Sequence, residues 1–288
     1  MYLPPNCPTL DKVSEPQIRL GIQGFGGTGK TYAASTFPNP VYLNPDRGLG
    51  AQFGRADIVE VPVWKKEFCK TINPNFGNSS SVTIKDIIEL WLKKDGTKLE
   101  EDQTLVVDGN TGLQNAYHKW YEQNPVVTKG GKIDDFAEWR LKINFFGDIC
   151  DTLKTLRCNV IYVCHETEKK DKGGDYTGKL RPLLRGQFGD EIMTHFTDWV
   201  RAHSTSKDKA LASANDNTLK LWNMSSSEYR EMVNSFSGNA IYFWQLESDE
   251  FFDGKVSSLS GFPKYIPATY ASFRRYMKNK ISIAPLAA

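Results

Sequence analysis

Short apolar runs alternate along the chain with longer stretches in which apolar residues recur every three or four positions. The short runs predict buried strands, and the longer stretches predict helices that pack against them. This alternation favours an α/β fold with a mainly parallel central sheet flanked by helices. We expect strands at residues 18–23, 41–43, 58–63, 104–107, 160–164, 197–202 and 241–246.

The longest helical pattern covers residues 135–157, and a second pattern covers residues 84–94. Acidic residues begin the longer helix and basic residues end it, which suits the helix dipole. Its apolar stripe comprises Phe136, Trp139, Ile143, Phe146, Cys150 and Leu153. We expect the large aromatic residues of this helix and of the last two strands to lie in the core. They are Trp139, Phe145, Phe146, Trp199, Tyr242, Phe243 and Trp244.

The length of 288 residues suits one domain of this class, because no linker-like segment divides the chain. We expect an extended arm at residues 1–15 and a single domain at residues 16–288. Loops are predicted at 124–133, 166–187 and 204–227. The last loop is rich in Ser, Asn and Lys, which is typical of an exposed or partly disordered excursion.

Composition narrows the functional class. The net charge is +2, so binding to nucleic acid would need a local basic patch rather than an overall field. The mean hydropathy of −0.47 and the lack of a long apolar run argue against a membrane protein. The five cysteines show no CxxC spacing, which argues against a disulfide framework or a zinc site. We therefore expect a cytoplasmic protein without a membrane partner.

The strongest chemical signal is the segment GFGGTGKT at residues 24–31. It fits the pattern GxxxxGK[ST] and lies between a predicted strand and a predicted short helix, the context that a phosphate-binding loop (P-loop) requires. Glycines let backbone N–H groups approach phosphate oxygens, and the helix N-terminus adds positive potential. Lys30 would reach the β- and γ-phosphates, and the Thr31 hydroxyl would bind Mg²⁺. The predicted ATP-binding residues are Gly24, Gly26, Gly27, Thr28, Gly29, Lys30, Thr31 and Tyr32.

A second part of such a site is the apolar strand at residues 104–107, which is followed by Asp108. A carboxylate at the end of a buried strand can hold Mg²⁺ directly or through water. The next residue is Gly109 rather than glutamate. A catalytic base must therefore come from elsewhere in the chain.

Two further polar residues follow predicted strands. Asp46 comes after the strand at 41–43 and could activate the attacking water, although an Asn-Pro-Asp sequence is also typical of an ordinary turn. His165 comes after the strand at 160–164 and could contact the γ-phosphate, or it could be a histidine satisfied at a strand end. The residues alone leave both alternatives open.

The order of these motifs resembles that of the RecA-like ATPases, in particular the short ones encoded by bacteriophages and used in recombination. The resemblance implies that Asp108 is the Walker B carboxylate, that Asp46 stands where the family has its catalytic glutamate, and that His165 is the γ-phosphate sensor. It also implies that Phe53 lies near the aromatic residue that stacks on adenine. Four segments carry the resemblance: GFGGTGKT (24–31), VYLNPDRGL (41–49), TLVVDGNTGL (104–113) and NVIYVCHETEK (159–169).

The same resemblance implies a function. It implies a Mg²⁺-dependent ATPase that acts in DNA recombination, replication or repair and binds or anneals single-stranded DNA. It further implies a homo-oligomer, either a ring or a filament, with phage or host recombination or replication proteins as partners. For a phage-encoded protein, the location would be the cytoplasm of the bacterial host.

In RecA-like proteins, a DNA-binding loop follows the sensor, and here that loop would be residues 166–187. Its cations, glycines and tyrosine suit phosphate contacts and base stacking on a single strand. Its interleaved acidic residues equally suit an ordinary solvated hairpin. By analogy, Arg185 or Lys255 could instead reach the ATP of a neighbouring subunit. The candidate DNA-binding residues are Lys169, Lys170, Lys172, Tyr176, Lys179, Arg181 and Arg185.

Two other functions remain open. A small-molecule kinase of the nucleoside type would use the same P-loop, with Arg181 and Arg185 in a lid. In the RecA-like class an extra strand separates the P-loop strand from the Asp108 strand, whereas in the kinases these two strands are neighbours. A nucleotide-gated assembly or packaging component would bind nucleotide with little turnover. A GTPase and an ABC ATPase are disfavoured, because the chain has neither an NKxD nor an LSGGQ motif.

Overall fold

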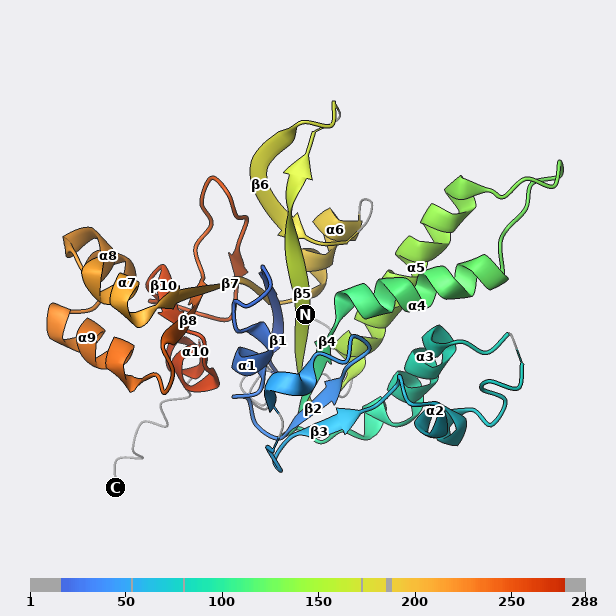
Figure 1. The fold of residues 1–288 in the computed structure, drawn as a ribbon, viewed down its shortest axis with the longest axis horizontal. Coiled ribbons are helices and arrows are strands. Elements are labelled where there is room, and N and C mark those ends of the chain that lie inside the picture. Colours follow the sequence, from blue (N-terminus) through green and yellow to red (C-terminus); the bar gives the residue numbers. More distant parts are fainter. Residues whose placement is uncertain (1–16, 53, 80, 172, 185–187, 278–288) are drawn as a thin grey trace, which may run out of the picture.

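The computed structural model describes residues 17–52, 54–79, 81–171, 173–184 and 188–277 of the chain (Figure 1). Within these residues, one sheet of ten strands runs through the molecule. Its parallel part consists, in spatial order, of β3 (Val59–Val61), β2 (Pro40–Leu43), β4 (Thr104–Asp108), β5 (Asn159–Lys170), β1 (Arg19–Gly24) and β7 (Asp198–Ser206). The antiparallel strands are β8 (Ala240–Gln245), β10 (Tyr265–Pro267), β6 (Tyr176–Pro182) and β9 (Lys255–Val256). The predicted α/β class with a mainly parallel sheet is confirmed.

Helices cover both faces of the sheet, so that each central strand is buried on both sides. Leu105 and Val107 of β4 contribute to one apolar core, and Val106 contributes to another. The first core also contains residues of α2 (Lys66–Ile72), α3 (Ile84–Lys94), α4 (Asn110–Gln123), α5 (Asp135–Thr155) and α6 (Phe188–Glu191). The second core contains residues of α1 (Lys30–Ala34) and α10 (Tyr270–Tyr276). None of the described helices is both long and apolar enough to cross a bilayer.

Local capping explains where the two predicted helices begin. In α3, the Thr83 backbone N–H donates to the Asp86 carboxylate at 2.7 Å in a capping box. In α5, the Asp134 carboxylate accepts from the backbone N–H groups of Phe136 and Ala137 at 3.1 and 3.0 Å. Both helices therefore begin at the predicted residue, although α5 ends at Thr155 rather than at residue 157.

The segment at 166–187 was predicted to be a loop, and this prediction is wrong for most of its length. Strand β5 continues to Lys170 and pairs with β6 in an antiparallel hairpin that projects from the sheet (Figure 1). The Asp171 carboxylate accepts from the N–H groups of Gly173 and Asp175 at 2.8 and 2.9 Å, which fixes the turn. The charged residues and glycines that suggested a loop therefore belong to the turn and to the solvent-exposed side chains of the hairpin.

The segment at 204–227 was also predicted to be a loop, but it folds largely into short helices. These are α7 (Lys207–Ala212), α8 (Asp216–Trp222) and the start of α9 (Ser226–Ser235). The polar residues that suggested disorder are their caps, because Ser206, Asn215 and Ser225 each accept a hydrogen bond from the first turn of a helix. Trp222, Tyr229 and Val233 then bury themselves in a small separate core.

The prediction of core aromatics is correct for four of the seven residues. Trp199 and Trp244 are fully buried, as are Phe145 and Phe146 of α5, whereas Tyr242 and Phe243 are half-buried. Trp139 is 37% exposed, so its assignment to the core is wrong. The first turns of α5 extend beyond the sheet next to the end of α4 (Figure 1), and Phe136 in these turns is exposed as well.

Candidate active site

The P-loop connects the end of β1 to the start of α1, as predicted. Gly27 and Gly29 have φ angles of 79° and 76°, which side-chain-bearing residues rarely adopt. At Gly29, a Cβ atom would lie 2.3 Å from the ring of Tyr242. The Lys30 ammonium donates to the carbonyl oxygens of Gly24 and Phe25 at 2.8 and 2.7 Å, inside the loop. This buried cation stands where phosphate oxygens could replace the two carbonyl partners.

The side chains of Thr31, in the first turn of α1, and Asp108, at the end of β4, are in direct contact. The Thr31 hydroxyl donates to the Asp108 carboxylate at 2.6 Å, and the Tyr42 hydroxyl donates to the backbone carbonyl of Thr31 at 2.8 Å. Burial raises the pKa of Asp108 to about 6, and Asp46 also raises it, although the hydrogen bond from Thr31 and the charge of Lys30 oppose the rise. Because ionising this buried carboxylate costs free energy, a bound cation would stabilise its charged form.

The donor set around this pair fits Mg²⁺ bound together with a nucleotide. In the part of the chain that the structure describes, no group of three or more His, Cys, Asp or Glu residues could hold a metal by itself. Mg²⁺ commonly uses one or two protein ligands and completes its shell with phosphate oxygens and water. Thr31 and Asp108 would therefore hold the ion only when phosphates are present.

Asp108→Asn is expected to stabilise the metal-free and nucleotide-free protein at pH 8. Burial raises the folded-state pKa of Asp108 from 3.8 to about 6, so the stabilisation from its bound proton is lost as the pH rises through about 6. An amide escapes this loss, and the free energy of unfolding should rise by about 1–3 kcal/mol at pH 8 and by little at pH 4. Denaturant titration at both pH values measures this, and equal effects at the two would contradict it.

The loop after β2 presents Asp46 to the same region. The Asn44 side chain closes this loop, because its carbonyl accepts from the Gly48 N–H at 3.0 Å and its amide donates to Glu60 at 2.9 Å. Burial raises the pKa of Asp46, and the backbone N–H of Gly112 opposes that rise. The sequence prediction missed Asn44, for which the only signal was an Asn-Pro turn with a glycine four positions after the asparagine.

Two glycines allow Asp46 to approach the end of β4. A Cβ atom at Gly109, where φ is 122°, would lie 2.9 Å from Asp46 side-chain atoms. A Cβ atom at Gly112 would lie 2.4 Å from an Asp46 carboxylate oxygen and 2.8 Å from the backbone of Pro45. The residue after Asp108 is thus a glycine, and the space left by its missing side chain is taken by the Asp46 carboxylate, which comes from the loop after the neighbouring strand β2.

Gly112→Ala is expected to displace Asp46 and lower kcat for ATP hydrolysis by roughly tenfold to a hundredfold. The new methyl group cannot coexist with the Asp46 carboxylate at 2.4 Å, whereas α4 itself gains helix propensity. Steady-state kinetics and a thermal melt measure the two effects together. Gly147→Ala in α5 is a matched control, because nothing lies within 4 Å of a Cβ atom there. Unchanged kcat in Gly112→Ala would contradict the positioning of Asp46.

His165 lies beside Gly24 in the parallel register of β1 and β5. Burial and then the charge of Lys30 lower the pKa of His165, which favours the neutral form of the ring. The adjacent Glu166 points the other way in the strand and is buried. It accepts from Arg201 at 3.0 Å and from Gln23 at 3.3 Å, so its carboxylate is already committed to other partners.

One cavity of about 360 Å³ brings most of the predicted residues together, although Gly24, Gly26 and Thr28 do not line it. Its walls include the P-loop, Asp46, Asp108 and His165, and also Asn110 and Tyr242, which sequence reasoning had not assigned to the site. Tyr32, predicted to contact the nucleotide, lines this cavity, and its ring lies 5.6 Å from that of Tyr242. Phe53, predicted near the adenine, lies outside the described residues.

Several of the predicted DNA-binding cations have partners within the chain. Asp190 pairs with Lys169 at 3.1 Å and with Arg181 at 3.8 Å. Other contacts are Lys179 with Asp253 at 3.5 Å and the Lys170 ammonium 4.6 Å from the Tyr176 ring centre. Lys172 and Arg185 lie outside the described residues. Lys255, considered as a trans-acting cation, donates to the Phe196 carbonyl at 2.6 Å.

Comparisons with known proteins agree with this geometry. A family model described as AAA domain matches residues 17–238. This span covers more than half of the chain and contains the P-loop, Asp46, Asp108 and His165. A search of curated proteins finds no match.

Proposed function

Since the chain belongs to the AAA-domain family, whose members are P-loop ATPases, we propose that it is a Mg²⁺-dependent, RecA-like ATPase that acts on single-stranded DNA in recombination, replication or repair. One observation carries the ATPase part of this proposal. Strand β5 lies between β1 and β4, so that the P-loop, Asp108 and the loop carrying Asp46 meet His165, which lies within β5, around one cavity.

Each residue then has a role in hydrolysis. Lys30 and the backbone N–H groups of the P-loop bind the β- and γ-phosphates, and Thr31 and Asp108 would hold Mg²⁺, which neutralises phosphate charge when bound. Asp46 orients a water molecule for in-line attack on the γ-phosphate and accepts its proton. The neutral ring of His165 donates a hydrogen bond to the γ-phosphate end of the site.

The strand order favours this reading over a small-molecule kinase. In that class, the P-loop strand and the Walker B strand would be neighbours, but here β5 separates them. The lid of a kinase would also need free arginines, and Arg181 is already paired with Asp190. A nucleotide-gated assembly component remains a second candidate, because binding without turnover would use the same P-loop.

Contacts between the site and the hairpin support an action on DNA. The Leu183 N–H, just after β6, donates to the His165 carbonyl at 2.7 Å, and the Asn110 amide donates to the Leu183 carbonyl at 3.1 Å. A shift of His165 or Asn110 on hydrolysis would therefore reach the base of the β5–β6 hairpin. At the outer part of the hairpin, Lys170 and the 65% exposed Tyr176 offer a cation and an aromatic ring to a single strand.

ATP turnover with and without single-stranded DNA tests the proposal. We expect DNA to raise the turnover of the wild type several-fold, and Tyr176→Ala combined with Lys170→Ala to lower this stimulation ratio, because stacking contributes about 1–3 kcal/mol per base. Lys93→Ala, an exposed lysine of α3, is the matched control. Turnover that ignores every nucleic acid would contradict the DNA part, and no turnover at all would favour the assembly component.

A further inference from the structure

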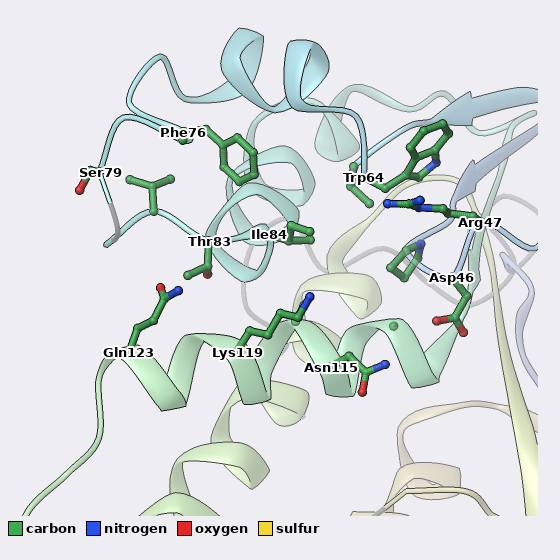
Figure 2. A pocket seen from close by; sticks show the side chains of 16 residues that line it. Asp46, Arg47, Trp64, Phe76, Ser79, Thr83, Ile84, Asn115, Lys119 and Gln123 are labelled. Atoms are coloured by element: carbon green, nitrogen blue, oxygen red, sulfur yellow. The ribbon is translucent and has the colours of Figure 1, made fainter.

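A second and larger cavity, of about 490 Å³, lies beside the nucleotide cavity and shares Asp46 with it (Figure 2). Its walls come from the loop after β2, the residues after β3, the start of α3 and one side of α4. Its volume is within the range of small-molecule sites in proteins. Of the residues that line this cavity, the proposed ATPase mechanism uses only Asp46 and Gly112, which leaves space for Asp46.

One wall is a cation stacked on an indole ring. The Arg47 guanidinium lies 4.9 Å from the centre of the Trp64 ring, and the indole N–H donates to Glu60 at 3.2 Å. Arg47 has a φ of 61°, a left-handed conformation that a side-chain-bearing residue adopts at some cost. This strained backbone aims the guanidinium between Trp64 and the open cavity, as Figure 2 shows.

The floor of the cavity is polar and basic. Asn115, Lys119 and Gln123 recur every four residues on α4 and line the cavity, and Lys119 and Gln123 point from that helix toward the opposite wall (Figure 2). Lys119 is exposed, and among the described residues no hydrogen bond or ion pair is found for its ammonium group. Phe76 and Ile84 supply apolar contacts on the side opposite Arg47.

We propose that this cavity binds a nucleotide unit, meaning a nucleobase with its phosphate. A flat base would stack on the guanidinium plane of Arg47, which Trp64 backs, with Phe76 and Ile84 on its other side. The phosphate would pair with Lys119, and the amides of Asn115 and Gln123 would meet the polar edge of the base. Two cations against one carboxylate give the cavity the net charge that an anionic ligand needs.

Occupancy of this cavity is coupled to hydrolysis through the loop that Asn44 closes. Arg47 directly follows Asp46, and both lie between the two ends of the Asn44–Gly48 hydrogen bond. A base stacked on Arg47 orders this loop and holds Asp46 in place, so the ligand should raise kcat rather than the affinity for ATP. This inference rests on the proposed function and names the place where a nucleotide unit, free or part of a strand, acts on Asp46.

The same chemistry could come from a free nucleotide or from a unit of a strand, and two probes separate these sources. The probes are 2-aminopurine deoxynucleoside monophosphate and a single-stranded oligonucleotide with one internal 2-aminopurine, whose fluorescence falls on stacking. We expect the full-length wild type to quench at least one probe and Lys119→Met to bind that probe roughly tenfold or more weakly, as for a lost charged hydrogen bond. Lys119→Arg should recover most of the affinity, and Lys93→Met should bind like the wild type.

The outcomes separate this inference from the proposed function. If the wild type hydrolyses ATP and responds to DNA but Lys119→Met and Trp64→Leu bind the quenched probe with unchanged affinity, the cavity is not the site, although the proposed function stands. If neither probe is quenched, the inference is overturned. If probe binding depends on Lys119 in a protein without ATP turnover, the nucleotide site stands and the proposed ATPase falls. Quenching by the oligonucleotide alone identifies a strand as the ligand, and quenching by both probes identifies a free nucleotide as sufficient.

Discussion

Lys30→Ala is expected to lower the rate of ATP hydrolysis by about 10³-fold and to weaken ATP binding as well. The ammonium group is the buried cation of the P-loop and is held by the carbonyl oxygens of Gly24 and Phe25. Its loss removes the charge that neutralises the β- and γ-phosphates in the transition state, and no other cation lines the described part of the nucleotide cavity. Phosphate release in a coupled assay measures the turnover, and calorimetric titration measures the binding.

Two controls keep this result interpretable. Lys93→Ala removes an exposed lysine of α3 far from the site in sequence and should leave turnover unchanged. A thermal melt of Lys30→Ala shows whether the loop still folds, since the ammonium also donates hydrogen bonds to two carbonyl groups of the loop. Turnover within threefold of the wild type, in a folded variant, would contradict a phosphate-binding role for Lys30.

Asp46→Asn is expected to lower kcat by about 10²–10³-fold while ATP binds almost as tightly as before. The amide fills the same space against Gly109 and Gly112, but it cannot accept a proton from the attacking water. Burial raises the pKa of Asp46, so the turnover of the wild type should also fall on the acidic side as this carboxylate becomes protonated. A pH–rate profile of both proteins measures this, and the acidic limb due to Asp46 should be missing from the variant.

Asp46→Glu serves as the matched comparison, because it keeps the carboxylate and lengthens the side chain by one carbon. It should retain more turnover than Asp46→Asn, although the close approach of Gly112 limits the space for the longer chain. A purely steric role of Asp46 would give the opposite order, with turnover kept in Asp46→Asn and lost in the longer Asp46→Glu. If the wild type itself binds ATP without hydrolysing it, and both variants bind ATP as tightly, the result would instead favour an assembly component.

Sequence patterns predicted the parallel strands well, because strands buried on both faces are continuous apolar runs. Strands β2, β4 and β5 begin within one residue of the predicted positions, and Asp108 follows the predicted apolar run as the last residue of β4. The same sequence patterns did not predict β6 and α7, which lie in segments expected to be loops. Hairpin pairing depends on a distant strand, and the serines and asparagines that cap short helices also occur in loops.

The P-loop, Asp46, Asp108 and His165 could be selected from the sequence because each follows an apolar strand in a known kind of position. Their convergence could not, because it depends on the strand order that brings β5 between β1 and β4. Asn44 and Asn110 escaped selection, since asparagine is common in turns and only their partners, Glu60 and the Leu183 carbonyl, reveal their use.

The sequence by itself determined the class of fold and the presence of a phosphate-binding loop, because hydrophobic periodicity and glycine conformation act locally along the chain. Only the tertiary structure decided which carboxylate meets Gly112 and that Arg47 stacks on Trp64 beside a second cavity. It also decided that Trp139 stays at the surface. These outcomes depend on how distant segments pack, and packing is a property of the whole chain rather than of any one stretch of it.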